Sequence, residues 1–181
     1  NRPDCLSVIG IAREVAAITG RKLKLPGESV RPCAVRSGHY FSIEIEDKKD
    51  CPLYTAKIIQ NVKVGASPDW LKSRLELIGC RSVNNIVDIT NYILFETGEP
   101  LHAFDLDRLS PGKIIIRRGK KDEKIITIDA QERLLGPEIL VISDKEKPVA
   151  IAGVMGGKDT EVTESTKNIL LEAAAFNPAV V

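Results

Sequence analysis

The chain has 181 residues, of which 43% are hydrophobic and 28% charged, and its formal net charge at pH 7 is +1. This composition is that of a globular protein long enough to bury a hydrophobic core. The nearly balanced charge argues against a domain that grips a long stretch of nucleic acid by itself. No apolar run approaches the roughly 20 residues that a membrane-spanning helix needs, so we expect a cytoplasmic domain.

The cysteines and histidines argue against a metal site. The chain has four cysteines, with no C-x-x-C pair, and two histidines. That spacing is poor for zinc, and a chain with a good core does not need disulfides. We therefore expect reduced thiols and no bound metal.

The beginning of the chain predicts one helix, a linker and one strand. Asp4 can cap a helix that closes at Gly20. Prolines and glycines over 23–38 indicate a linker or loop. Apolar residues then alternate with polar ones over 41–46, which predicts a half-buried strand.

A longer strand and a clear helix come next. The strand spans 53–64, and its apolar side changes near Ile59, where we expect a bulge. Ser67 suits the N-cap of the helix, Pro68 its first position and Gly79 the position after its last. The buried stripe of this helix is predicted to be Leu71, Leu75 and Ile78.

A second helix is predicted over 84–97, ended by Gly98 and Pro100. Its apolar positions recur at helical spacing, at Ile86, Ile89 and Ile93. Asp88 lies early, where a carboxylate suits the helix dipole. Its polar residues are poor choices for a plain surface helix, namely Asn84, Asn85, Thr90 and Asn91. A turn then presents His102, so this region predicts one wall of a pocket.

The rest of the chain is predicted to be rich in strands. Short apolar runs are separated by Gly, Asp, Lys and Pro, at 114–116, 125–128, 139–143, 149–154 and 169–173. Neither βαβ alternation nor a G-x-G-x-x-G motif is present, which argues against a doubly wound nucleotide-binding fold. Helices early and strands late predict an α+β domain.

Several polar residues have both a structural and a functional interpretation. His102 could be structural, or its near-neutral pKa could suit holding or activating water, or binding a ribose or phosphate oxygen. Thr90 and Asn91 could offer a hydroxyl and an amide to an ester or a ribose, or only cap and bridge within the fold. The glycines of A-G-V-M-G-G over 152–157 could let a ligand approach the backbone and turn their N–H groups toward an oxyanion, or only form a turn.

Glu172 stands alone inside the apolar run 169–176. A carboxylate buried there must be paired, hydrogen-bonded or protonated. It either points outward from a strand or recognises a hydroxyl or an amine. The chain has no Ser-His-Asp signature, H-E-x-x-H or Walker sequence. A hydrolase built here would therefore position water against an already activated bond.

Several motifs carry a resemblance to a known family, in the order N-I-V-D-I-T-N-Y, P-L-H-A-F-D, A-G-V-M-G-G and L-L-E-A-A-A-F-N-P. Together with N-R-P-D-C-L-S-V-I-G-I-A-R-E at the start, they resemble the B3/B4 editing region of the bacterial phenylalanyl-tRNA synthetase beta subunit over nearly the whole chain. The resemblance implies a β-sandwich-like core with helices packed outside. It also implies that 1–181 is a fragment of a longer beta subunit, with a helical lead-in over about 1–38 and an intertwined core in the remainder.

The resemblance also implies a function. The family's module binds the 3′ end of the phenylalanine tRNA and hydrolyses tyrosine wrongly attached to it. It lies within a heterotetramer of two alpha and two beta subunits, and the alpha subunit carries out aminoacylation with ATP and Mg²⁺. No cofactor is expected in the domain itself. By motif, the catalytic positions fall on Thr90, Asn91 and His102, and the substrate-binding positions on Ala152, Gly153 and Glu172.

A physical reason supports this assignment. A hydrophobic synthetic pocket excludes one added hydroxyl poorly, whereas a second site with a buried acceptor can demand that hydroxyl. Glu172 would be that acceptor. The family continues past F-N-P with a basic stretch that completes the pocket, so part of the lining is expected to lie beyond Val181. Two other interpretations remain: a non-catalytic structural or tRNA-interaction module of the synthetase, and a free-standing aminoacyl-tRNA deacylase.

Overall fold

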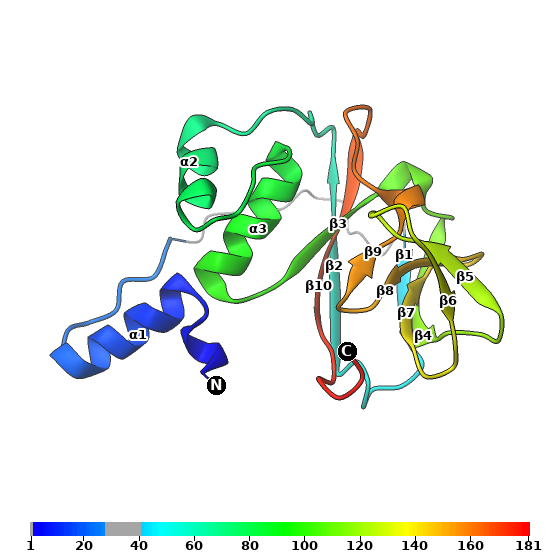
Figure 1. Cartoon of the computed structure of the whole chain (residues 1–181), viewed down its shortest axis with the longest axis horizontal. Coiled ribbons are helices and arrows are strands. Elements are labelled where there is room, and N and C mark those ends of the chain that lie inside the picture. The colour runs from blue at the N-terminus through cyan, green and yellow to red at the C-terminus, as the bar shows by residue number, and fades with distance from the viewer. Residues whose placement is uncertain (1, 28–40) are drawn as a thin grey trace. The chain divides into compact units, whose positions relative to one another are not determined.

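The structure is a computed structural model that describes residues 2–27 and 41–181. The chain forms two compact units, Asn1–Val35 with Ala66–Leu101 and Arg36–Gly65 with His102–Val181. The first unit holds the α-helices and the second holds the β-sheets (Figure 1). The predicted α+β class is therefore confirmed. The helical lead-in shares its unit with 66–101, because α1 and α3 are in contact, while the packing of helices outside the β core stays a prediction.

The first helix is capped later than the sequence suggested. A short 3-10 helix, Pro3–Cys5, precedes α1, which spans Val8–Thr19. The prediction that Asp4 caps the helix is wrong, because Ser7 Oγ accepts the hydrogen bond from the N–H of residue 10 at 3.0 Å. The helix ends as predicted at Gly20, which adopts the left-handed conformation common at helix ends, with a φ of 68°.

Helix α2 spans Asp69–Leu77 and has Pro68 as its N-cap residue. The predicted capping by Ser67 is wrong. The Ser67 hydroxyl instead donates a hydrogen bond to Asp88 Oδ2 at 2.5 Å, so it is not available to cap the helix. Gly79, with a φ of 80°, follows the end of the helix as expected.

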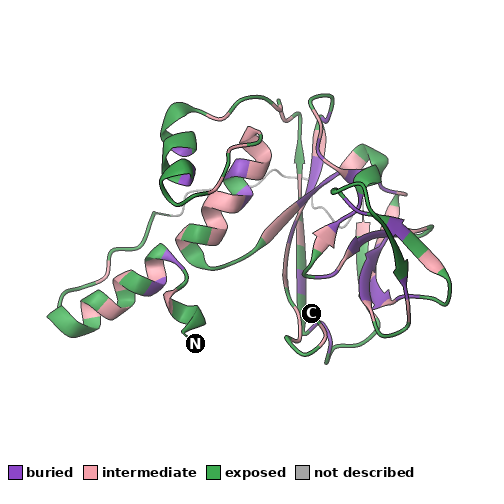
Figure 2. Ribbon diagram, viewed as in Figure 1, coloured by how far each residue is buried: buried purple, intermediate pink, exposed green. Residues whose placement is uncertain are grey.

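The apolar stripes of the two later helices are only partly buried (Figure 2). Leu71 and Leu75 are buried as predicted. Ile78, just past the end of α2, is 52% exposed, and Ile89 on α3 is 48% exposed. Helical spacing alone therefore overstates how much of each apolar face this unit covers.

Helix α3 spans Asn85–Thr97. Asn84 caps it, because its Oδ1 accepts hydrogen bonds from the N–H groups of residues 86 and 87 at 3.1 and 3.0 Å. Gly98 ends it with a φ of 86°. The predicted helix and its stop at Gly98 are confirmed.

Asp88 is fully buried within the first unit. It accepts hydrogen bonds from the Ser67 and Ser82 hydroxyls and from the N–H of Val83. Burial alone would raise its pKa, but these three bonds hold the pKa below its usual value. Its main role is therefore to tie α3 to the segments around it.

The largest sheet of the second unit has the strand order β1-β4-β7-β8-β9. Its strands are β1 Phe41–Ile45, β4 Gly112–Arg118, β7 Leu140–Ser143, β8 Pro148–Ile151 and β9 Met155–Gly156. Strands β1 and β4 pair in parallel, and the other neighbours pair antiparallel. This mixed order is unlike a doubly wound parallel sheet, as the sequence predicted.

Two smaller sheets complete the unit. One has the order β2-β10-β3, with β2 Leu53–Gln60, β10 Asn168–Ala175 and β3 Leu101–Asp105. The other pairs β5 Glu123–Ile126 with β6 Glu132–Leu135. Short 3-10 helices, Leu106–Arg108 and Lys158–Thr160, follow β3 and β9. The sequence did not predict β3 or β6.

The predicted bulge near Ile59 is wrong. Strands β2 and β10 pair antiparallel in one unbroken register, from Leu53 opposite Ala175 to Gln60 opposite Asn168. The strand then ends, because Asn61 adopts a left-handed φ of 58°. The apparent change of apolar side arises because 62–64 lie beyond the strand.

Both larger sheets contribute side chains to one hydrophobic core. It contains Phe104 of β3, Leu170 of β10 and Tyr54 of β2, beside apolar residues of β4, β7 and β8. The β-sandwich-like arrangement itself stays a prediction. No helix among residues 2–27 and 41–181 has the length and apolarity to cross a bilayer. Three cysteines in the same residues are free thiols, and Cys33 lies outside them.

Candidate functional site

Glu172 points into the hydrophobic core of the second unit. It lies on β10 between Leu170 and Ala174, which point to the same face and pack in that core. Its exposed fraction is 6%. The interpretation that Glu172 points outward to solvent is therefore wrong, and the carboxyl group lies where an unpaired polar group is costly.

Tyr54 is a neighbour of Glu172 across the sheet. Tyr54 on β2 lies opposite Ala174, and Glu172 lies opposite Ala56, so the two polar side chains are diagonal neighbours on one face. Tyr54 is also 6% exposed. Neither Tyr54 Oη nor Glu172 Oε2 has a hydrogen-bond partner among the described residues. Two buried oxygen atoms therefore lie near each other in the core, neither with a hydrogen bond of good geometry.

Burial controls the protonation of this pair. It raises the pKa of Glu172 to about 8, although the nearby Tyr54 hydroxyl lowers it in part. Burial, followed by the charge of Glu172, also raises the pKa of Tyr54. At neutral pH the Glu172 carboxyl is therefore mostly protonated, and both groups can donate as well as accept a hydrogen bond.

His102 lies on strand β3, directly after the predicted turn. Its ring contacts that of Phe104 edge to face, with centroids 4.5 Å apart. The imidazole also packs on Gly156: a Cβ atom there would lie 2.5 Å from His102 Cε1 and 2.7 Å from Nε2. Burial lowers the pKa of His102 to about 4. The imidazole is thus neutral at pH 7 and can accept a hydrogen bond through one nitrogen.

The glycine-rich segment forms the hairpin turn between β8 and β9. Gly153 has a φ of 71°. A Cβ atom at this position would lie 2.9 Å from Val181 Cγ2 and 3.2 Å from Phe176 Cδ2, so glycine permits a close contact. The N–H of Gly157 donates to the carbonyl of Val149 at 2.7 Å. That amide is used by the sheet, and the interpretation that it faces an oxyanion is wrong.

The other predicted site residues lie in different surroundings. Ala152 is 2% exposed and packs in the core of the second unit. Thr90 and Asn91 lie on α3 in the first unit. The Thr90 hydroxyl donates to the carbonyl of Val87 at 2.7 Å, so its proton serves the helix. That Thr90 and Asn91 line one cleft with His102, Gly153 and Glu172 stays a prediction.

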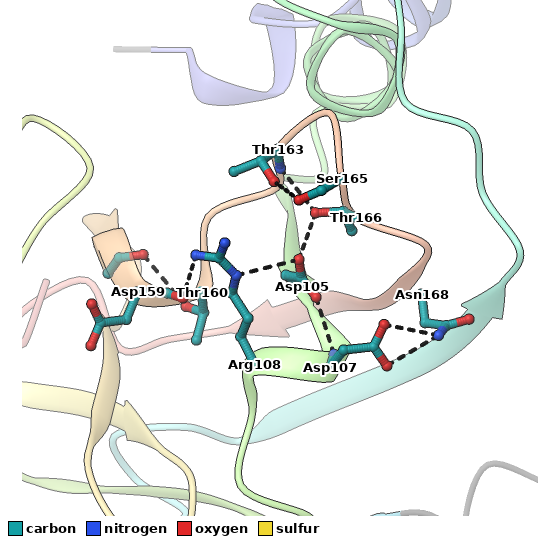
Figure 3. A network of polar contacts seen from close by, with 10 residues as sticks. Asp105, Asp107, Arg108, Asp159, Thr160, Thr163, Ser165, Thr166 and Asn168 are labelled. Atoms are coloured by element: carbon teal, nitrogen blue, oxygen red, sulfur yellow. Dashed lines mark hydrogen bonds and ion pairs between the residues drawn. The ribbon is translucent and has the colours of Figure 1, made fainter.

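A polar network that the sequence did not reveal ties β3 to the segment before β10 (Figure 3). Asp105, at the end of β3, is 4% exposed and accepts a hydrogen bond of 2.6 Å from Thr166 Oγ1. Arg108 Nε lies 3.7 Å from the same carboxylate. Asp107 accepts bonds of 3.1 and 3.0 Å from Asn168 Nδ2.

This network positions the two strands that carry the main site candidates. Asp105 is three residues after His102 on β3, and Thr166 is six residues before Glu172. Fixing these ends holds His102 and Glu172 in place along neighbouring strands. The D-L-D-R sequence that begins three residues after His102 is the signal that could have revealed it, because acidic residues at a strand end often bind nearby backbone and hydroxyl groups.

Comparisons with known proteins agree with this architecture. Residues 50–181 match the family described as B3/4 domain. Over its full length the chain is 54% identical to the phenylalanine–tRNA ligase beta subunit of Carboxydothermus hydrogenoformans and 50% identical to that of Geobacter metallireducens. It spans 22% and 23% of these relatives. An N-terminal fragment of the phenylalanyl-tRNA synthetase beta subunit from Pyrococcus horikoshii shares the fold, with a TM-score of 0.57 over the whole chain and 55% of that fragment, at 18% identity.

Proposed function

The chain belongs to the B3/4 domain family, and we propose that it is the editing module of a phenylalanine–tRNA ligase beta subunit. In this role it binds the 3′ end of the phenylalanine tRNA and hydrolyses the ester of tyrosine wrongly attached there. The beta subunit would act in the cytoplasm, in an assembly of two alpha and two beta subunits. ATP and Mg²⁺ would serve aminoacylation elsewhere in that enzyme.

The buried carboxyl of Glu172, whose Oε2 has no hydrogen-bond partner among the described residues, carries this proposal. A tyrosyl group differs from a phenylalanyl group by one hydroxyl, which a hydrophobic pocket excludes poorly. A polar atom already held in an apolar core gains a partner when that hydroxyl arrives. With phenylalanine it stays unpaired, at a cost of about 1–3 kcal/mol. Such a site therefore selects the substrate that has the hydroxyl.

His102 supports a hydrolytic role for the same unit. Its imidazole is neutral at pH 7, because burial lowers its pKa to about 4. A neutral imidazole can hold a water molecule or a ribose hydroxyl through hydrogen bonds. An aminoacyl ester is already activated, so the site must position water and needs no protein nucleophile. The terminal ribose hydroxyl of the tRNA could help to activate that water.

The test is deacylation by the assembled synthetase. Wild-type enzyme should hydrolyse tyrosyl-tRNA faster than phenylalanyl-tRNA, both made on the phenylalanine tRNA. Glu172→Ala should reduce that preference roughly 5- to 150-fold, the equivalent of about 1–3 kcal/mol. Phenylalanine charging should stay at the wild-type rate.

Glu164→Ala, in an exposed turn of the same unit, is the matched control and should leave both rates unchanged. If wild-type synthetase hydrolyses neither ester, the module is structural or binds tRNA without catalysis. If Glu172→Ala slows both esters equally, Glu172 serves the fold or the chemistry and does not read the hydroxyl.

A further inference from the structure

We propose that Tyr54 is a second specificity-determining residue, whose hydroxyl acts with the Glu172 carboxyl as a receptor for the phenolic hydroxyl of the substrate. This inference rests on the proposed function and extends it to a residue outside the recognised motifs. Tyr54 lies in L-Y-T-A-K, far from Glu172 in the sequence. Only the pairing of β2 with β10 brings the two residues to one face of the sheet.

Small residues flank the two polar groups on this face of the sheet. Tyr54 and Glu172 occupy one diagonal of two adjacent cross-strand pairs, and Ala56 and Ala174 occupy the other. The alanines add only methyl groups between the polar side chains. This part of the sheet is thus built from two polar groups and two small ones.

The unmet hydrogen bonds of this pair are complementary to a hydroxyl. Tyr54 Oη and Glu172 Oε2 are both without a partner among the described residues, and each side chain is 6% exposed. A single hydroxyl both donates and accepts, so it can satisfy one atom with its proton and the other with its lone pair. Water does the same but lacks the apolar ring that the surrounding core favours. The matching ligand is therefore a phenol attached to an apolar ring.

The protonation of the pair favours a hydroxyl over an amine. An ammonium group needs an ionised carboxylate nearby, but burial keeps Glu172 mostly protonated at neutral pH. The nearby Cys51 thiol is already occupied, since it donates to the carbonyl of Leu53 at 3.4 Å. Two neutral groups that donate and accept thus remain, and they suit a neutral hydroxyl.

Tyr54→Phe tests the inference by removing one oxygen while keeping the ring in the core. In the assembled synthetase, kcat/KM should be measured for deacylation of tyrosyl-tRNA and phenylalanyl-tRNA. The ratio of the two should fall roughly 5- to 150-fold, the range for one unpaired buried group. The fall in the ratio should come from a lower kcat/KM for the tyrosyl ester. Tyr92→Phe makes the same chemical change on α3, where the hydroxyl bonds Arg74 and Glu96, and should leave the ratio unchanged.

A binding measurement separates this inference from the proposed function. Tyrosyl and phenylalanyl adenosine analogues with an amide in place of the ester can be titrated into the synthetase by calorimetry. Wild type should prefer the tyrosyl analogue, and Tyr54→Phe should lose that preference whether or not hydrolysis occurs. If wild type deacylates tyrosyl-tRNA and Tyr54→Phe keeps its full ratio, only the Tyr54 inference is overturned. If wild type shows no preference in either assay, both are overturned.

Discussion

The imidazole of His102 lies directly against Gly156, so close that a side-chain carbon at residue 156 would stand 2.5 Å from His102 Cε1. Non-bonded carbon atoms normally approach no closer than about 3.5 Å. The glycine therefore serves as a backbone surface on which the ring rests. The ring is held on another side by Phe104.

Gly156→Ala should displace the His102 ring. We expect it to lower the free energy of unfolding by about 1–3 kcal/mol, the usual cost of overpacking a well-packed site. Deacylation of both esters should slow as well, because the ring moves. Gly27→Ala is the matched control, since a Cβ there meets nothing within 4 Å. Urea unfolding of both variants measures the difference, and equal unfolding curves would contradict this packing account.

The stability of the chain should fall as pH rises from about 6.5 to 8. The pKa of Glu172 is about 8 in the folded chain and 4.5 ordinarily, so in this range the folded state keeps a proton that the unfolded state has lost. The free energy of unfolding should therefore decrease by about 1.4 kcal/mol per pH unit from this group.

His102 has the opposite effect at lower pH. Its pKa falls from 6.5 to about 4 on folding, so the unfolded state binds the extra proton and stability rises with pH in that window. Between about pH 4.5 and 6.5 the contributions of Glu172 and His102 to the free energy of unfolding offset each other. Glu172→Gln should remove the decline in the free energy of unfolding between pH 6.5 and 8. Urea unfolding at several pH values tests this, and parallel slopes in the wild type and the variant would contradict it.

His102→Ala should slow hydrolysis of both esters by roughly 100-fold, because a misplaced water or ribose loses the reactive geometry. Discrimination between tyrosine and phenylalanine should change little. Since His102 is neutral above its pKa of about 4, the wild-type rate should show no inflection from this residue between pH 6 and 7. Single-turnover deacylation across pH measures both effects. A variant that loses activity on the tyrosyl ester alone would instead assign recognition to His102.

Thr166→Val should loosen the attachment of β3. It removes the hydroxyl that bonds the buried Asp105 carboxylate at 2.6 Å and leaves that carboxylate short of a partner. The expected loss is about 1–3 kcal/mol in the free energy of unfolding. Ser165→Ala, at an exposed residue whose hydroxyl hydrogen-bonds with that of Thr163, should stay within about 0.5 kcal/mol of wild type. Chemical denaturation of the two variants compares them, and similar losses would mean that Asp105 does not depend on this bond.

Local rules predicted the C-terminal ends of α1 and α3. Gly20 and Gly98 both adopt the left-handed conformation that stops a helix. These outcomes depend on a few consecutive residues, so short stretches of sequence contain the needed information. Ser67 shows where such rules fail. Its hydroxyl had a local role available as an N-cap, but Asp88, 21 residues away, accepts its hydrogen bond instead.

The strands also differ in whether local sequence or tertiary pairing determines them. Alternation located β1, and apolar runs located most later strands, but β3 was not predicted. Its residues 101–105 follow a proline and include a histidine and an aspartate, and it exists because β10 pairs with it. The bulge expected near Ile59 was wrong for a related reason, since Asn61 ends the strand and the register with β10 stays unbroken.

Some properties of Glu172 were determined by the sequence, and others only by the tertiary structure. A lone carboxylate in an apolar run was visible in the sequence, but the run allowed either face of a strand. Its burial follows from the packing of two sheets around one core, and its neighbour Tyr54 comes from a strand more than a hundred residues earlier. Side-chain type and spacing are local properties, whereas burial and unmet hydrogen bonds depend on which distant strands pair.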